Sequence, residues 1–381
     1  MAELRGRREK FPQMSYPRDC VLLCTTVFVS LTLHVSVSAV GLLYPFETET
    51  RETKVLDGVW DFKVAPPLDP DLGFREEWYQ RPLRLVTSDV IPMPVPSSYN
   101  DVTASKSLQQ HVGWWVNGAF LMNHTGGHLP FEAEATEFLV PGSRNWVTVA
   151  INNTLTQHSI PMGQLKYYSE ESGFPAGYRE LQFNFDFFNY AGIHRHVHLY
   201  TVPSAAHVND VTVVADTTQV PVENKAYLDF SVSVVHDESL APDVEVHLYD
   251  ETGNSVATAT GTSGRLSIVN PVLWWPYLMN ETYGYLYELE VVVRTPSVQS
   301  NDPAAFAVWT EAKSLHSFQK TKRAGDVLDV YRLKVGLRSL TWDNDTMAIN
   351  GKPIYFRGFG MHEDHDFVSA VKGRKTLEKF N

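Results

Sequence analysis

The chain has 381 residues, of which 43% are hydrophobic and 20% are charged, a composition typical of folded globular proteins and unlike that of disordered ones. This length suffices for two or three domains that each bury a core. The formal net charge of −12 excludes nucleic acid and anionic membrane surfaces as main partners, because both repel a negatively charged protein.

The N-terminus has the pattern of a secretory signal peptide. Basic residues precede an apolar stretch from Val21 to Val37, which ends at the small-residue pattern Val37-Ser38-Ala39. The sequence therefore predicts a signal peptide over residues 1–39; a signal anchor is the alternative, although His34 and nearby hydroxyl side chains weaken a permanent span. Cleavage removes both Cys20 and Cys24 and leaves no disulfide. We expect the secretory pathway, the lysosome or the extracellular space as the location, without a membrane span after cleavage.

Four N-glycosylation sequons are spread along the chain, at Asn123, Asn152, Asn280 and Asn344. One sequon alone is weak evidence, because chance supplies some. Four sequons behind a signal peptide predict a lumenal glycoprotein, with these asparagines in exposed loops or at strand ends.

Residues 40–205 predict a jelly-roll sandwich. Short alternating strands such as Val59–Val64 and Trp146–Ile151 are separated by Pro, Gly and Asn turns. The pair Asn117-Gly118 predicts a tight hairpin. The best helical window, Gly73–Gln80, is short, so the predicted class is all-β.

Residues 206–340 predict an immunoglobulin-like sandwich, because seven strand segments recur at regular spacing. These segments are Val211–Ala215, Ala226–Val235, Val244–Tyr249, Val256–Thr260, Leu266–Val269, Tyr285–Val293 and Val330–Val335. Since no cysteine is available, side chains such as Phe230, Val232 and Leu289 have to hold the two sheets together. The polar stretch 297–323 fits neither sheet and is predicted to be a long insertion loop.

Residues 341–381 predict the start of a further domain. A turn at Ile349–Pro353 leads into a predicted strand, Ile354–Gly358, which we take as a barrel-type first strand. The residues from Lys372 onward are basic and are predicted to form a solvated tail.

One candidate sugar ligand is Asp186, which lies in the aromatic segment Phe183–Gly192. A carboxylate accepts hydrogen bonds from sugar hydroxyls, while aromatic faces exclude water and stack on the C–H faces of pyranose rings. An equal alternative is a strand in which Asp186 faces solvent.

Two groups of histidines superficially resemble metal sites. His194, His196 and His198 alternate along a predicted strand, but no obvious carboxylate or cysteine completes a tetrahedral set, so three polar strand residues are the favoured interpretation. His362-Glu363-Asp364-His365 lacks the spacing of a zincin helix. The sequence also holds no nucleophile elbow, phosphate loop or dinucleotide fingerprint. We therefore expect neither a metal nor a cofactor.

His362 and Asp364 are predicted instead to contact substrate. They follow the carboxyl end of the predicted barrel strand, which is where barrel enzymes place their active sites. Glu363 and Asp364 cannot form a hydrolytic pair, because neighbours in an extended chain point to opposite sides.

A series of motifs, in order along nearly the whole chain after residue 39, resembles the animal lysosomal β-glucuronidases of glycoside hydrolase family 2. The motifs are Leu43-Tyr44-Pro45, Leu56–Trp60, Met93–Asp101, Gly126–Ala133, Asp186–Gly192, Leu273–Met279 and Ile349–Pro353. The resemblance implies that residues 40–205 are a galactose-binding-like, sugar-binding jelly roll, followed by an immunoglobulin-like domain and the start of a (β/α)₈ barrel. It further implies a homotetramer that removes β-glucuronate from glycosaminoglycan ends.

The resemblance also implies roles for particular residues. Asp186 matches an aspartate that reaches the glucuronate from the first domain, and His362 matches a barrel histidine that contacts the same sugar. The segment Gln164–Phe185 is similar to a hairpin associated with lysosomal sorting. The implied partners are a β-glucuronide-type carbohydrate and further copies of the chain.

Three departures from the family pattern change the expected function. Two family strands are missing near Trp114, the insertion at 297–323 is longer than the family's loop, and the sequence after Phe367 leaves the pattern. The acid and nucleophile glutamates of the family lie on later barrel strands, so we expect no catalytic residue here and a silent chain. Two alternatives stay open: a lectin-like or regulatory chain that pairs with full-length subunits, and a splice product that does not fold.

Overall fold

A computed structural model describes the chain between Leu42 and Gly360, with gaps. The described ranges are 42–66, 69–98, 111–127, 129–152, 154–160, 162–168, 171, 173–174, 178–183, 191–296 and 324–360. The predicted signal peptide over 1–39, the insertion at 297–323 and the tail from Lys372 lie outside these ranges.

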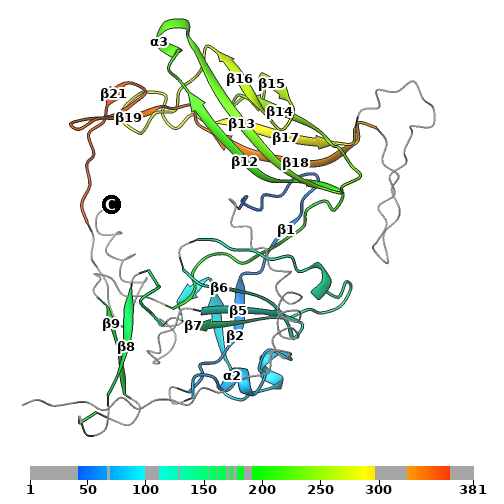
Figure 1. The fold of residues 1–381 in the computed structure, drawn as a ribbon, viewed down its shortest axis with the longest axis vertical. Helices are drawn as coiled ribbons and strands as arrows, with labels where there is room; N and C mark the ends of the chain where they lie inside the picture. The colour runs from blue at the N-terminus through cyan, green and yellow to red at the C-terminus, as the bar shows by residue number, and fades with distance from the viewer. Residues whose placement is uncertain are drawn as a thin grey trace, which may run out of the picture. The chain divides into compact units, whose positions relative to one another are not determined.

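Within the described ranges the regular secondary structure is almost entirely β-strand, which confirms the all-β prediction (Figure 1). Every strand pair found there is antiparallel. The α-helices of this part, α2 (Leu72–Arg75) and α3 (Val220–Glu223), have four residues each. No helix in the described part is long and apolar enough to span a membrane.

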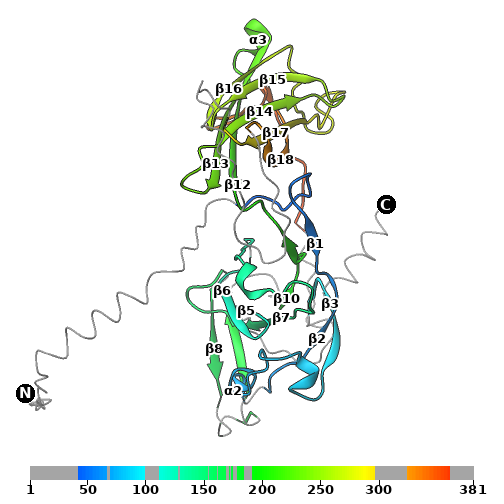
Figure 2. The same cartoon turned by 90° about the vertical axis from the view of Figure 1, so that its right-hand side faces the viewer.

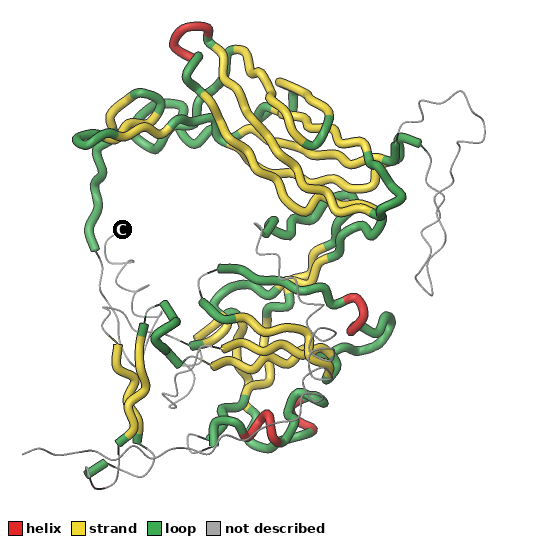
Figure 3. The backbone as a smooth tube through the Cα atoms, viewed as in Figure 1, coloured by secondary structure: helices red, strands yellow, loops and turns green. Residues whose placement is uncertain are grey.

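Two facing sheets form a seven-strand sandwich from Ala206 to Val335 (Figure 3). One sheet has the order β12-β13-β16 and the other the order β15-β14-β17-β18. The strands are β12 (Ala206–Asp216), β13 (Lys225–His236), β14 (Asp243–Tyr249), β15 (Ser255–Thr260), β16 (Ser263–Val269), β17 (Tyr287–Arg294) and β18 (Val327–Val335). Each strand overlaps one of the seven predicted segments, because alternating apolar residues specify which face of a strand is buried.

The core of this sandwich comes from the alternating inward side chains of both sheets. Leu228 and Ile268 from one sheet and Val246, Leu289 and Val291 from the other are fully buried. The predicted sheet-holding residues Phe230, Val232 and Leu289 all belong to this cluster. Burial of each such side chain is worth about 1.5–3 kcal/mol relative to exposure, so packing can replace the missing disulfide.

Residues 44–52, here called the N-terminal strap, are attached to β12 and β18 of the sandwich by hydrogen bonds. Arg51 donates from Nη2 to Oδ2 of Asp329 over 2.6 Å and from Nε to Oδ1 over 3.1 Å. The same Nη2 donates to the carbonyl oxygen of Val208 over 2.6 Å. Further along the strap, Arg332 of β18 donates to both carboxylate oxygens of Glu49, over 2.8 and 2.9 Å.

Asp329 of β18, which accepts the hydrogen bonds from Arg51, is a buried carboxylate with several hydrogen-bond donors. It is 0% exposed, and Arg51 is 4% exposed. Burial alone would raise the pKa of Asp329. The Arg51 guanidinium, the Val208 N–H and the Thr50 hydroxyl outweigh it and hold that pKa below its usual value.

The strands between Thr53 and Tyr200 form five small antiparallel sheets (Figure 2). The pairs are β1 (Thr53–Val55) with β11 (His198–Tyr200), β2 (Gly58–Phe62) with β3 (Ile91–Val95), β4 (Ser97–Ser98) with β10 (Gly192–Ile193), and β8 (Gly163–Tyr167) with β9 (Arg179–Phe183). The fifth sheet has the order β6-β5-β7, with β5 (His111–Val116), β6 (Ala119–His124) and β7 (Val147–Asn152). Fewer side chains are buried here than in the seven-strand sandwich.

The predicted hairpin at Asn117-Gly118 connects β5 to β6. Both turn residues have positive φ, +52° and +84°, which is the backbone that this dipeptide favours in a two-residue hairpin loop. β5 contains the junction of Trp114 and Trp115, where the sequence analysis expected two family strands to be missing, and it is a continuous strand paired on both sides. The sequence around this junction therefore forms a local three-stranded sheet.

The residues after the sandwich differ from the prediction. β19 (Leu340–Trp342), β20 (Met347–Ile349) and β21 (Lys352–Pro353) form a small antiparallel sheet, with the expected turn at Asn350-Gly351. The segment Ile354–Gly358, predicted as the first barrel strand, is not a strand, and Tyr355 in it is 83% exposed. A barrel strand needs parallel neighbours on both sides, and no parallel pair exists in the described residues.

Candidate functional site

The three predicted substrate contacts, Asp186, His362 and Asp364, lie outside the described residues. The structure does describe both flanks of the segment that contains Asp186. On its N-terminal side, β9 pairs with β8 over five residues. On its C-terminal side, β10 pairs with β4. The ends of the candidate sugar segment are therefore tied to two different sheets.

The C-terminal flank is held tightly by close backbone contact. The hydroxyl of Ser98 donates to the carbonyl oxygen of Ala191 over 3.0 Å, and Ala191 is 2% exposed. Gly192 has φ +145°, and a Cβ there would collide with the carbonyl oxygen of Ser97. Only glycine fits this backbone without strain, so the close pairing of β10 with β4 requires a glycine at this position.

The histidines after this segment make two different contacts. Nδ1 of His196 lies 2.6 Å from Oδ2 of Asp57, and the hydrogen bond to His196 is the main cause that lowers the pKa of this carboxyl. The His198 ring meets the Tyr44 ring edge-on at 5.6 Å between centroids, and its buried Nδ1 has no hydrogen-bond partner among the residues that the structure describes. The contact between Asp57 and His196 escaped the sequence analysis, although Asp57 belongs to the motif Leu56–Trp60.

His194, His196 and His198 do not share one strand, contrary to the expected alternation. β10 ends at Ile193, residue 195 is a bend, and β11 begins only at His198. Within the ranges that the structure covers, no group of three or more histidine, cysteine, aspartate or glutamate side chains could hold a metal ion.

Tyr200 on β11 provides a fixed phenol next to these histidines. Its hydroxyl donates a short hydrogen bond to Oε2 of Glu132. Burial, followed by the hydrogen bond to Glu132, raises the pKa of Tyr200 well above its usual value. The phenol therefore stays protonated and joins the motif Gly126–Ala133 to β11.

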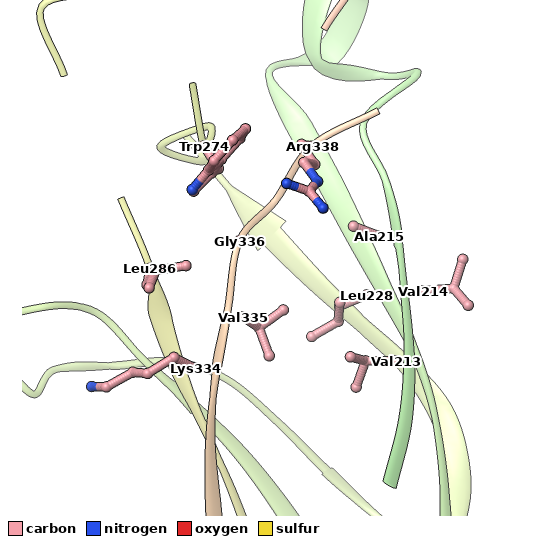
Figure 4. A pocket seen from close by; sticks show the side chains of 10 residues that line it. All are labelled: Val213, Val214, Ala215, Leu228, Trp274, Leu286, Lys334, Val335, Gly336 and Arg338. Atoms are coloured by element: carbon pink, nitrogen blue, oxygen red, sulfur yellow. The ribbon is translucent and has the colours of Figure 1, made fainter. Parts of the chain in front are cut away.

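A second candidate site is a pocket of about 500 Å³ on the seven-strand sandwich (Figure 4). Its apolar wall includes Val213, Leu228 and Val335. Figure 4 shows Trp274 and Arg338 beside each other at one end, and the Arg338 guanidinium lies 4.6 Å from the centroid of the Trp274 ring. This cation–π contact fixes a positive charge at the pocket.

Backbone and amide hydrogen bonds position Trp274 at this pocket. Its N–H donates to the carbonyl oxygen of Leu337 over 2.9 Å, and its carbonyl accepts from Nδ2 of Asn350 over 2.9 Å. Oδ1 of Asn350 in turn accepts from the N–H of Ser339 over 2.9 Å. Two separate family motifs, Leu273–Met279 and Ile349–Pro353, thus meet at one place.

The two cations of the pocket differ in availability. Nζ of Lys334 lies 2.8 Å from Oε2 of Glu288, so the charge of Lys334 is already paired. Arg338 forms no salt bridge with any residue that the structure describes. An apolar wall, an indole face and one such guanidinium are groups that suit a ligand with both an apolar face and an anionic oxygen.

The four sequons lie in different surroundings. Asn123, Asn280 and Asn344 are exposed, whereas Asn152 is half-buried. Oδ1 of Asn152 accepts from the N–H of Thr154 over 3.2 Å, and Oδ1 of Asn280 accepts from Thr282 over 2.9 Å. Asn152 is the last residue of β7, so it lies at a strand end as expected, although its side chain is half-buried.

Comparison with known proteins relates this architecture to sugar hydrolases. Residues 104–203 match the description "Glycosyl hydrolases family 2, sugar binding domain". The rat protein named beta-glucuronidase is 36% identical over 370 residues, which cover 88% of this chain and 51% of the rat protein. The human protein of the same name is 36% identical over 363 residues, with 86% and 51% covered. The chain therefore spans about half the length of these relatives.

Solved structures give the same relation. The beta-glucuronidase of Lactobacillus rhamnosus superposes with a TM-score of 0.67 and 27% identity, covering 90% of this chain and 54% of that one. The beta-D-glucuronidase of Dictyoglomus thermophilum superposes with a TM-score of 0.64 and 29% identity, with 89% and 53% covered.

Proposed function

Because the chain resembles the amino-terminal part of the β-glucuronidases of glycoside hydrolase family 2, we propose that its residues form the sugar-binding, non-catalytic portion of a β-glucuronidase-type protein. The observation that carries this proposal is the match at 36% identity over 86–88% of the chain. The match of residues 104–203 to a sugar-binding domain supports it. The ligand class is then a β-glucuronide-type carbohydrate.

Asp186 is the proposed contact from the first part of the chain to the acidic sugar, with His362 and Asp364 as further contacts. The support comes from the flanks, since β9 and the Ala191–Gly192 backbone anchor both ends of the segment. A segment fixed at both ends loses less conformational entropy when it binds a ligand.

Catalytic silence is the second part of the proposal. A retaining glycosidase needs a general acid and a nucleophile about 5–5.5 Å apart on opposite sides of the bond. In barrel enzymes the catalytic groups come from the ends of several parallel strands, within a scaffold of roughly 200 residues or more. The described residues form only antiparallel sheets, and their α-helices have four residues each.

The test of silence is turnover of a chromogenic β-glucuronide by the purified chain. We expect no release of the chromophore above a preparation from host cells that carry the empty vector. Hydrolysis that co-purifies with the chain and exceeds this control would refute silence.

The test of sugar binding is calorimetric titration with glucuronate. Asp186→Asn is expected to weaken any binding, whereas Asp71→Asn should leave it unchanged, since the Asp71 side chain makes no helix-capping hydrogen bond. Equal affinity of the wild type and Asp186→Asn would refute the role of Asp186. Sedimentation with a full-length subunit tests the regulatory alternative, because only a pairing chain co-sediments.

Entry into the secretory pathway, with the lysosome or the extracellular space as destination, is the third part. The leader over 1–39 and the four sequons support it. Glycosidase-sensitive mobility of the chain expressed in animal cells checks it, and a chain that stays unglycosylated in the cytosol would contradict it.

A further inference from the structure

Strand β6 is an edge of the sheet β6-β5-β7, and within the described ranges no strand pairs with its outer side. The strand has the sequence Ala-Phe-Leu-Met-Asn-His and holds no Asp, Glu, Lys or Arg. An open, uncharged edge presents unpaired N–H and C=O groups to other chains, and natural proteins cover or charge such edges. Another kind of protection is therefore needed at β6.

A β-bulge places an aromatic ring and a sequon on the same face of this edge strand. Asn123 pairs with Gly113, but the register shifts after Trp114, so that Phe120 pairs with Trp115. Residues that pair across strands share a face, and Gly113 and Trp115 are two residues apart on β5. Phe120 and Asn123 therefore share a face. In a regular strand, two residues that are three positions apart would lie on opposite faces.

Asn123 is exposed on this face. Its cross-strand partner Gly113 has no side chain, and the Trp115 ring lies over that glycine, where a Cβ would be too close to the ring. Trp115 itself is buried, with its ring stacked on Tyr79 at 4.9 Å. The Phe120 ring meets the Trp115 ring edge-on at 5.6 Å between centroids and is still 53% exposed, so it offers an exposed aromatic surface beside Asn123.

We propose that Asn123 carries an N-linked glycan whose first N-acetylglucosamine stacks on the Phe120 ring and covers the open edge of β6. The residues of β5 that pair with Asn123 and Phe120 are two positions apart, so Asn123 and Phe120 are separated by about 7 Å along the strand. An asparagine side chain and one pyranose ring can bridge this distance. The C–H face of the sugar then lies on the exposed ring. The proposal rests on secretory entry, and its test separates the two.

The first measurement is site-by-site glycan occupancy of the full chain expressed in animal cells. Glycopeptide mass spectrometry after enzymatic release in heavy-oxygen water marks each asparagine that bore a sugar. We expect Asn123 to be occupied in most molecules. An empty Asn123 with sugar at Asn280 or Asn344 overturns this site alone, and four empty sequons overturn it together with secretory entry.

The second measurement tests the stacking, with chains trimmed by endoglycosidase to a single sugar. Thermal midpoints are compared for the wild type, Asn123→Gln, Phe120→Ala and the double variant. We expect Asn123→Gln to lower the midpoint by about 2 °C or more when Phe120 is present, and by clearly less in the Phe120→Ala background. Equal shifts in both backgrounds overturn the stacking.

Tyr167→Ala is the matched control for the cycle. Tyr167 is an exposed aromatic residue on β8, which belongs to a different sheet from Asn123. Removing it should leave the effect of Asn123→Gln unchanged. If Tyr167→Ala reduces that effect as much as Phe120→Ala does, the coupling is not specific to Phe120 and the proposal fails.

Discussion

The buried pair between Arg51 and Asp329 predicts a stability change of definite sign and size. We consider Arg51→Met, which keeps much of the side-chain volume but removes the charge. Asp329 then stays buried, with hydrogen bonds from Thr50 and Val208 but no cation. Removing one partner of a buried pair costs about 3–5 kcal/mol. About 1.4 kcal/mol corresponds to a tenfold change in an equilibrium constant. The state in which β12 and β18 open locally therefore becomes roughly 100- to 5000-fold more populated.

The pH dependence of this variant should have the opposite sign to that of the wild type. In the wild type the pKa of Asp329 is lowered, so its stabilising contribution is present above the unfolded pKa of about 3.9 and is lost as the pH falls through the folded value. Without Arg51, burial dominates and raises the pKa of Asp329. Lowering the pH from neutral then protonates the carboxyl and restores stability to Arg51→Met.

Hydrogen exchange of β12 and β18 is the assay, because the Val208 N–H donates directly to Asp329 over 2.8 Å. Rates are corrected for intrinsic exchange at each pH. The double variant Arg51→Met with Asp329→Leu is the control and should recover most of the protection, since an apolar pair avoids the buried charge. A change of less than about 1 kcal/mol in Arg51→Met, or a loss of protection on acidification, would refute the reasoning.

Three further predictions follow from single contacts. Leu289→Ala should lower the free energy of unfolding of the sandwich by about 2–5 kcal/mol, measured by denaturant titration, because it opens a cavity in a fully buried cluster; a change below 1 kcal/mol would contradict this packing. Gly192→Ala should increase proteolysis near residues 184–190, since its Cβ collides with the Ser97 carbonyl; unchanged cleavage would show that the backbone adapts. His196→Gln should raise the pKa of the Asp57 carboxyl toward its ordinary value in a titration followed by nuclear magnetic resonance, and an unchanged pKa would contradict the contact.

The sandwich could be predicted from the sequence because its strands carry their own signal. Leu228 and Phe230 alternate with polar residues along β13, and that alternation alone specifies a half-buried strand. The hairpin at Asn117-Gly118 was equally local, since two positive φ values are needed and this dipeptide adopts them readily.

Contacts between distant residues could not be predicted in the same way. Asp329 looks like an ordinary charged residue within a strand, and its partner Arg51 is 278 residues away. Asp57 and His196 are separated by 139 residues, and a carboxylate in a conventional motif gives no sign of its partner. The strand predicted at Ile354–Gly358 was wrong because its apolar pattern does not specify which neighbours are available to pair with it.

The N-terminal strap has a consequence for how the protein is made. Arg51 and Asp329 are 278 residues apart in the sequence. Since a ribosome adds about 5–20 residues per second, Asp329 is synthesised roughly 15–60 s after Arg51. During that interval the guanidinium has to remain hydrated while the earlier sheets form. The sandwich can complete its attachment to the strap only after Asp329 has emerged, which gives chaperones time to act on the nascent polypeptide.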